Sequence, residues 1–550
     1  MLPWVTAALA DIYIVQNGWP RPSWGECLAE LALFALAGRV QWGLARGWAR
    51  SALVPAAVVV FYAAMRYAPR PWHQLVPFLI GLTIALTAIV RFVGARRSVP
   101  AAAGVAAAVA TVLASHYVDV TALERPEMAA PHSLLEDLVW PGRALASVRP
   151  SSNGPPVVVI SIDTLRADAA AEMEVVRRLA ARGAYWPRAM STSSWTLPAL
   201  ASLQTGKLPA DHGAGCLLGG HCQGIFPEVV TLAQQLREGG YATCAAVSNA
   251  WIARGTGFDR GFDRFVDPGS TLYRLLVGFS RAGGVHRQDG QHVVDAAVEW
   301  LEDAPKRGIY LWVHVMDPHL PYRHAAEGPL QSLNAADLRN SMPLSAEQRR
   351  LMRAGYATEV AYTDRQLLRL VDALERRGIL DEGIVVLTAD HGEEFWDHDG
   401  VEHGHSHHGE ITDVPLVLVA PGVAPGVRRD VASLVDVAPT VRAALGLPAD
   451  GIDLRAAVPD DRIALAWGSL ILRMDCSARD VRRRVIVRRC PDADRETAVF
   501  DLASDPRELV PLAADPSDRV VTAAQAVQGP RPGEAARVDR NALRALGYVQ

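Results

Sequence analysis

From residue 156 onward, short apolar runs alternate with longer amphipathic stretches. The runs have the length and the β-branched content of buried strands. They are Val157–Ile162, ATCAAVS starting near Ala242, Ile309–Val315, Ile384–Ala389 and Val414–Ala420. The stretch Tyr356–Arg376 has helical spacing instead. Strands that are apolar on both faces and are separated by helices are typical of a largely parallel sheet covered on both sides, so we predict an α/β domain with the layers of an α/β/α sandwich.

The pattern changes again near Ala449. Two strand-like runs, Ile463–Met474 and Arg484–Arg489, follow within a stretch rich in turn residues. We predict that residues 449–550 form a small C-terminal α+β subdomain and a tail. The segment Pro511–Ala536 is polar and interrupted by prolines, and we interpret it as a loose excursion rather than a core element.

The first 120 residues are more apolar than the rest. The clearest stretches are Ala52–Met65, Leu75–Val90 and Pro100–Tyr117, and Leu28–Leu44 is interrupted by two charges. These lengths predict an N-terminal helical transmembrane region with about four spans. For the opening residues a cleaved signal peptide is the alternative, although a basic leader is missing there. Residues 121–155 carry several prolines and read as a linker, so the predicted main domain spans 156–448.

Arginines predict the orientation of this region. Arg91, Arg96 and Arg97 lie between the last two predicted spans. Because positively charged loops stay in the cytoplasm, we expect a multi-pass protein of the plasma (inner) membrane whose main domain lies on the periplasmic or extracellular side.

Composition narrows the classes of function. A formal charge of -4 over 550 residues gives no overall basic field, so we expect no nucleic-acid partner. Two cysteine pairs, Cys216 with Cys222 and Cys476 with Cys490, are close enough in sequence for local disulfides, as suits an oxidising compartment. Unpaired thiols are the alternative, because connectivity does not follow from sequence.

Chemically useful side chains follow the predicted strands. Asp163 ends the first, and Asp390 and His391 end another. Carboxylates and an imidazole that meet at the carboxyl ends of parallel strands could hold a divalent cation. Thr196 precedes an amphipathic run and could lie at a helix N-terminus that stabilises an anion, or be a simple N-cap. His314, Asp317 and His319 belong to the motif HVMDPHLPY at a third strand.

These segments, in this order, resemble the sulfatase family within the alkaline phosphatase superfamily. IDTLRAD resembles its first metal-binding motif, and TxPxxxxLxTG from Thr196 to Gly206 resembles its nucleophile motif. Later blocks that match are GYATCAAVSNAWIARGTGFDRGFDRF, DPHLPY, TADHGEEF, HGHS, SLVDVAPTVRAALGLP, FDLASDPRELVPLA and the closing LRALGYV. The resemblance implies an alkaline-phosphatase-like sandwich and a metal-dependent hydrolase or transferase of sulfate or phosphate esters.

The resemblance also implies roles for single residues. Asp163, Asp390 and His391 would bind the metal, and the Thr196 hydroxyl would be the nucleophile on the same ion. His319 and either His403 or His405 would contact the ester or protonate its leaving group. We favour His405 on spacing, with His403, His314 and Asn249 as the substrate-binding residues.

The cofactor is expected to be one divalent ion (Ca, Mn, Zn or Mg) rather than two. A second ion would draw on Asp317, His319 and His405. The tract DHDGVEHGHSHHG also permits plain metal binding at the surface.

Departures from the family pattern bear on the chemistry. Sulfatases carry Cys or Ser at the nucleophile position, then Pro and Arg, whereas this chain has Thr196, Pro198 and Leu200. The lysines that clamp sulfate are missing, since none follows Lys306. A threonine nucleophile instead resembles the phosphodiesterases, phosphoethanolamine transferases and lipoteichoic acid synthases of the superfamily.

We therefore expect a membrane-embedded enzyme that acts on phosphate or sulfate esters of lipid headgroups or envelope glycans. One alternative is a true sulfatase that works without the oxidised residue. Another is a catalytically silent membrane protein that uses the fold for binding or assembly.

Overall fold

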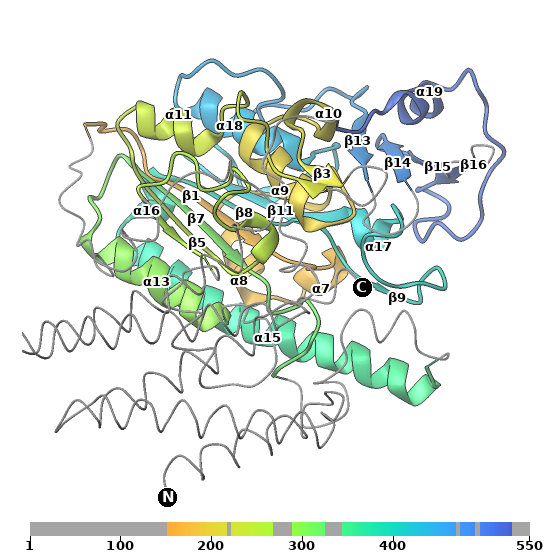
Figure 1. Cartoon of the computed structure of the whole chain (residues 1–550), viewed down its shortest axis with the longest axis horizontal. Helices are drawn as coiled ribbons and strands as arrows, with labels where there is room; N and C mark the ends of the chain where they lie inside the picture. Colours follow the sequence, from red (N-terminus) through yellow and green to blue (C-terminus); the bar gives the residue numbers. More distant parts are fainter. Residues whose placement is uncertain are drawn as a thin grey trace, which may run out of the picture. The chain divides into compact units, whose positions relative to one another are not determined.

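The computed structural model of the chain describes residues 151–216, 222–267, 289–324, 344–468, 474–489 and 496–530 (Figure 1). These residues belong to one compact unit, Glu136–Gln550. The predicted transmembrane spans and nearly all of the predicted linker lie outside the described residues. Within the described ranges, no helix combines the length and the hydrophobicity needed to cross a membrane.

A mixed, largely parallel sheet is the centre of the described part of the chain. Its eight described strands run in the order β12-β2-β11-β8-β1-β7-β5-β6, and β11 is antiparallel to its neighbours β8 and β2. The strands are β1 (Val157–Ile162), β2 (Ala184–Met190), β5 (Ala242–Val247), β6 (Arg264–Val266), β7 (Ile309–Val315), β8 (Ile384–Ala389), β11 (Asp413–Val419) and β12 (Gly426–Val427). All five predicted strands are present, which confirms the predicted α/β class and the largely parallel sheet.

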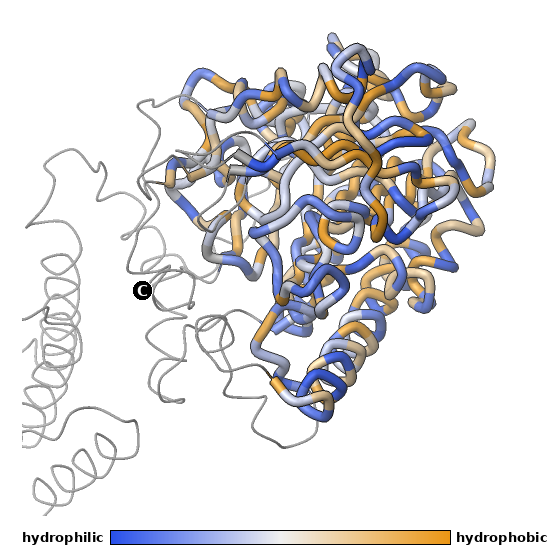
Figure 2. Tube along the Cα trace, turned by 90° about the vertical axis from the view of Figure 1, so that its right-hand side faces the viewer, coloured by the Kyte–Doolittle hydropathy of each residue, from blue (hydrophilic) through white to orange (hydrophobic). Residues whose placement is uncertain are grey.

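Helices cover both faces of this sheet (Figure 1). One face carries α7 (Ala167–Ala170), α8 (Glu174–Ala180), α13 (Gly290–Asp303), α15 (Ala346–Arg376) and α16 (Ile379–Glu382). The other carries α9 (Thr196–Thr205), α10 (Pro209–His212), α11 (Leu232–Glu238) and α18 (Val437–Ala444). Strands β1, β5, β7, β8 and β11 are buried along their whole length, and Figure 2 shows the hydrophobic band that they form.

Helix α15 begins ten residues earlier than the predicted stretch Tyr356–Arg376. Its first turns are mostly exposed and therefore lack the apolar spacing on which the prediction relied. The start is instead fixed by a capping box, in which the Ser345 hydroxyl accepts from the Gln348 backbone and the Gln348 side chain accepts from the Ser345 backbone.

The C-terminal part forms a second, antiparallel sheet of β13 (Ala464–Trp467), β14 (Met474–Arg479), β15 (Arg483–Arg489) and β16 (Glu496–Asp501). Helix α19 (Arg519–Ala526) packs on β14 and β15 through its buried residues Val520, Val521 and Ala524. Our interpretation of Pro511–Ala536 as a loose excursion was therefore wrong for α19, whereas the residues before this helix are mostly exposed and residues 531–536 lie outside the described ranges. The helix is only eight residues long, and one apolar stripe among polar residues suffices to bury it against a sheet.

A disulfide joins Cys216 to Cys222, which lie on the short strands β3 (Gly215–Cys216) and β4 (Cys222–Gln223). This confirms the first of the two predicted pairs. The second pair includes Cys490, which lies outside the described residues.

Candidate active site

The carboxyl ends of three neighbouring strands bring the predicted metal ligands together. In the sheet register, Ile162 lies opposite both Val315 and Ala389, so β1, β7 and β8 end at the same level. Asp163 and Asp390 follow β1 and β8 directly. Their carboxylates and one nitrogen of His391 lie within 4.8 Å of one another, and all three residues are fully buried.

The donor set fits a divalent cation. Asp163 Oδ1 and Asp390 Oδ2 are buried oxygens without a hydrogen-bond partner among the described residues. His391 Nδ1 lies 2.9 Å from the Gly392 carbonyl, which keeps the proton on Nδ1 and leaves Nε2 as the acceptor. That Nε2 lies 3.4 Å from Asp390 Oδ2 and 3.7 Å from Asp163 Oδ1. Two carboxylates and one imidazole around a common point are a ligand set for a divalent metal.

The charges of the two aspartates support this reading. Burial works against ionisation of Asp163, but its hydrogen bond with His314 and the charges of His319 and His391 outweigh burial and lower its pKa. Burial and the nearby charge of Asp163 raise the pKa of Asp390 well above its ordinary value. Without a cation, one of the two carboxylates therefore tends to hold a proton, as expected for like charges in one buried site.

Thr196 is the first residue of α9, and its hydroxyl faces the metal-ligand group. Thr196 Oγ1 lies 3.3 Å from His391 Nε2. The N-cap position of α9 belongs to Trp195, so Thr196 is not the simple N-cap that was the alternative interpretation. Gly206 ends the helix with φ 70°, a left-handed conformation that explains the glycine of the TxPxxxxLxTG motif.

The Asn249 side chain lies between Thr196 and the predicted metal ligand Asp163. It follows β5, and its side-chain oxygen accepts a hydrogen bond from the backbone of Trp251 at 2.9 Å. This orients Nδ2, which donates to Asp163 Oδ2 at 2.6 Å and lies 3.5 Å from Thr196 Oγ1. Asn249 is thus within reach of any group bound between Thr196 and Asp163.

His314 lies behind Asp163. This buried residue of β7 has Nε2 3.4 Å from Asp163 Oδ2 and Nδ1 2.9 Å from the Ser161 hydroxyl. His314 thus contacts the Asp163 carboxylate and the Ser161 hydroxyl. This geometry favours a role in orienting Asp163 over the predicted substrate contact.

The structure separates the two histidines between which the sequence left a choice. The His403 ring is 4.4 Å from the His391 ring and 4.9 Å from the His319 ring, measured between centroids. His405, which we favoured on spacing, instead has Nε2 2.7 Å from Glu394 Oε2. The cluster of imidazoles beside Thr196 therefore contains His391, His403 and His319.

Glu393 belongs to this cluster, and the sequence reasoning did not single it out. Its Oε1 lies 3.2 Å from His403 Nδ1. Burial, reinforced by the charge of Asp163, raises the pKa of Glu393 to about 8 despite the opposing effect of His391. A signal was present in the sequence: two consecutive glutamates, EE, are followed by two histidines that flank a glycine, HGH.

The other residues of the histidine tract are engaged in structural contacts. His398 bonds Glu410, His407 bonds Ser477 and the Gly468 carbonyl, and His408 bonds Glu508. In the described part of the chain, the only further group that could hold a metal is Asp317, His324 and Glu359. Neither His319 nor His405 is part of it, so the donor set considered for a second ion is not assembled.

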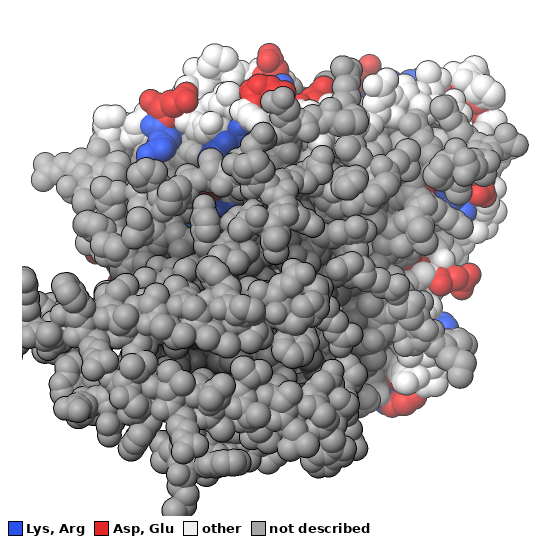
Figure 3. Space-filling view, viewed as in Figure 1, with Lys and Arg blue, Asp and Glu red and all other residues white. Residues whose placement is uncertain are grey.

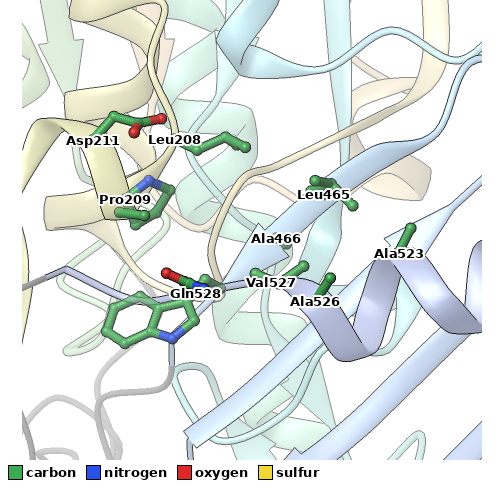
Figure 4. A pocket seen from close by; sticks show the side chains of 11 residues that line it. Leu208, Pro209, Asp211, Leu465, Ala466, Ala523, Ala526, Val527 and Gln528 are labelled. Carbon is green, nitrogen blue, oxygen red and sulfur yellow. The ribbon is translucent and has the colours of Figure 1, made fainter.

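A cavity of about 310 Å³ lies between α10 and the C-terminal subdomain (Figure 4). Its lining is mostly apolar, with Leu208, Leu465 and Val527, and it also includes Asp211 and Gln528 (Figure 4). None of the predicted metal ligands Asp163, Thr196, Asp390 and His391 lines it, so we do not assign the chemistry to it. On the face shown in Figure 3, acidic and basic side chains of the described residues lie next to one another along the upper edge, in keeping with the small formal charge.

A protein-family model and a curated relative match this chain in sequence. The sulfatase family model matches residues 155–447. The low-salt glycan biosynthesis sulfotransferase Agl7 of Haloferax volcanii is 25% identical over 315 residues, which cover 56% of this chain and 65% of that protein. The chain thus spans less than two thirds of the length of this curated relative.

Solved structures share the fold at low sequence identity. A Bacteroides thetaiotaomicron protein described as a sulfatase superposes with a TM-score of 0.54 at 18% identity, covering 68% of this chain and 90% of that one. The phosphonate monoester hydrolase of Agrobacterium radiobacter superposes with a TM-score of 0.52 at 20% identity, covering 66% and 92%. The fold implied by the sequence motifs is therefore confirmed.

Proposed function

Because this chain belongs to the sulfatase family, we propose that it is a metal-dependent enzyme that hydrolyses or transfers a phosphate or sulfate ester through Thr196. The observation that carries the proposal is the position of the Thr196 hydroxyl. It lies 3.3 Å from His391 Nε2, beside two buried carboxylate oxygens that have no hydrogen-bond partner among the described residues. Asp163, Asp390 and His391 would hold the divalent ion, which, when bound, lowers the pKa of the Thr196 hydroxyl and offsets negative charge on the ester.

In the first step, the Thr196 hydroxyl gives its proton to solvent, and Oγ1 attacks the phosphorus or sulfur atom. A new bond to Oγ1 forms, the bond to the leaving oxygen breaks, and an imidazole supplies the proton that the departing alkoxide needs. His319 and His403 are the donors that we propose, because the His403 ring adjoins both the His391 ring and the His319 ring. Asn249 Nδ2 donates a hydrogen bond to an oxygen of the transferred group.

In the second step, water or an acceptor hydroxyl attacks the same atom and gives up its proton to that imidazole. The bond to Thr196 then breaks. Water gives hydrolysis and an alcohol gives transfer, so the two outcomes share all residues named here.

We place phosphate esters ahead of sulfate esters. A phosphothreonine is resolved by attack at phosphorus, whereas a sulfated threonine lacks the easy exit of an aldehyde hydrate. Among the described residues, no Arg or Lys side chain bonds Thr196, Asp163 or Asn249, unlike a lysine clamp for sulfate. A true sulfatase is the second candidate, favoured by the family match itself.

The substrate that we propose is a lipid headgroup or an envelope glycan. The apolar stretches in the first 120 residues would hold the enzyme at a membrane, where a tethered site meets surface substrates at high effective concentration. The disulfide between Cys216 and Cys222 suits a domain outside the cytoplasm. A relative named for glycan biosynthesis supports a glycan as the substrate.

The test is turnover of matched aryl phosphodiesters, phosphomonoesters and sulfate esters by the full chain with Mn²⁺, Ca²⁺, Zn²⁺ or Mg²⁺. We expect Thr196→Ala to lose at least about 10³-fold in kcat and Thr196→Ser to recover part of it. Thr192→Ala is the matched control, since this buried threonine four residues earlier has no hydrogen-bond partner for its hydroxyl among the described residues. Turnover that survives Thr196→Ala on every ester class would remove the proposal.

Mass spectrometry of the peptide containing Thr196 identifies the group that moves. Brief exposure to a phosphodiester should add a phosphoryl-linked mass in the wild type and in Thr192→Ala but not in Thr196→Ala. A preference for sulfate esters by the unmodified protein would favour the second candidate.

A further inference from the structure

Glu393 is a buried carboxylate beside the imidazole cluster. Its exposed fraction is 1%, and its Oε1 lies 3.2 Å from His403 Nδ1. Its Oε2 has no hydrogen-bond partner among the described residues. Burying a carboxyl group costs free energy unless its polar contacts compensate for the lost water. The contact between Glu393 and His403 is therefore the one to explain.

The neighbouring Glu394 shows what a structural carboxylate looks like in this segment. It begins the short strand β9 (Glu394–Phe395), which pairs with β10 (Val401–Glu402). Glu394 Oε1 accepts from the backbone of His398 and of Gly400, and Oε2 bonds His405. Both of its oxygens are thus used to hold the hairpin together.

Consecutive residues of an extended chain point in opposite directions. Glu393 therefore pairs with His403 on the side of His391, and Glu394 pairs with His405 on the other. The dipeptide EE and the tripeptide HGH thus make two carboxylate–imidazole pairs, of which only one adjoins the proposed site.

We propose that Glu393 is a positioning residue that acts through His403. Its Oε1 accepts a hydrogen bond from Nδ1–H of His403, which fixes the tautomer and the ring orientation, so Nε2 is the atom that exchanges a proton with the ester. A third group that orients an acid–base imidazole in this way recurs in nucleophilic catalysis. As the leaving-group bond breaks, the proton on Nε2 moves to the departing oxygen, and Glu393 itself gains and loses no proton.

This inference rests on the proposed function and has its own test. The readout is the dependence of kcat on the leaving group, because a good leaving group needs no proton and a poor one does. With a 4-nitrophenyl and an alkyl ester of the same phosphodiester, we expect Glu393→Ala to lose about 10²-fold on the alkyl ester and under about 10-fold on the aryl ester. Glu393→Gln, which keeps the accepting oxygen, should recover part of the alkyl activity.

Two controls separate positioning from a merely structural role. Glu394→Ala removes the adjacent carboxylate and should change both esters by the same factor. In a double-mutant cycle, Glu393→Ala should add little to the loss already caused by His403→Ala, because the two residues act as one unit.

The outcomes are distinct. Equal losses on both esters, or additive effects in the cycle, overturn the inference while leaving Thr196 in place. Activity that survives Thr196→Ala removes the proposed function instead. If Glu393→Ala does not fold, the cycle with Glu393→Gln decides, since its smaller alkyl-specific loss should also vanish in His403→Ala.

Discussion

Two buried charged regions of this molecule are built in opposite ways. At the junction between β11 and the C-terminal subdomain, Asp413 is surrounded by Arg188, Arg479 and Arg484. Glu508 lies 3.0 Å from Arg484 Nε and 3.1 Å from His408 Nδ1. Burial opposes ionisation of Asp413, but the three arginines outweigh burial and lower its pKa.

At the candidate active site, by contrast, two carboxylates face each other, and the positively charged groups that act on them are imidazoles. Asp163 and Asp390 each keep one oxygen without a hydrogen-bond partner among the described residues. Opposite charges neutralise the junction from within the chain, whereas the site would need a bound cation for neutralisation. The difference separates a cluster that is neutral by itself from the cluster that we propose carries the chemistry.

The largest expected effect is the loss of activity in Asp163→Asn. Removing this ligand should lower kcat/KM by at least about 10³-fold, because nucleophile activation and charge neutralisation are lost together. Metal content of the purified protein should fall in parallel. A metal-free variant of unchanged activity would contradict the assignment.

At the junction the effect should fall on stability instead. Arg484→Met removes the arginine partner of the buried Glu508 and one of the three arginines around Asp413, and it should cost about 3–5 kcal/mol of unfolding free energy, measured by urea denaturation. Arg482→Met is the control, because that side chain is 66% exposed and should change stability by under about 0.5 kcal/mol. Metal affinity should be the same in both variants. A drop in affinity confined to Arg484→Met would mean that the two regions are coupled.

Helix α19 tests the stability of the C-terminal subdomain on a smaller scale. Val520→Ala removes two buried methyl groups from the contact with the antiparallel sheet and should cost about 1–2 kcal/mol. Thr522→Ala, at an exposed position of the same helix, should be nearly neutral. Equal small effects of both changes would show that α19 does not pack on the sheet in solution.

The smallest expected effect concerns pH. Burial lowers the pKa of His398, but its bond with Glu410 outweighs burial and raises that pKa to about 9. A raised pKa in the folded state means that the stabilisation is complete below about pH 6.5 and is lost as pH rises toward 9. The denaturation midpoint should therefore fall over that interval, and His398→Gln should flatten this dependence. An unchanged slope in the variant would exclude His398 as its source.

Much of the framework followed from sequence alone. The buried strands are long enough and apolar enough to be read from local pattern, as Val157–Ile162 and Ile384–Ala389 show. Residues that directly follow parallel strands must meet at one edge of the sheet. The predicted proximity of Asp163, Asp390 and His391 therefore needed no tertiary information beyond the strand order, and Thr196 at the start of α9 followed from its motif.

Only the tertiary structure decided which of the remaining side chains face the site. His403 and His405 flank the same glycine, Gly404, and their spacing is equivalent until the fold around the hairpin of β9 and β10 sets their directions. The same part of the fold places Glu393 beside His403. Helix α19 likewise depends on a sheet that covers its short apolar stripe. The local pattern of apolar residues predicts an element when that element is apolar enough to be buried whatever its neighbours are. A short or weakly apolar element forms only where a segment distant in sequence covers it.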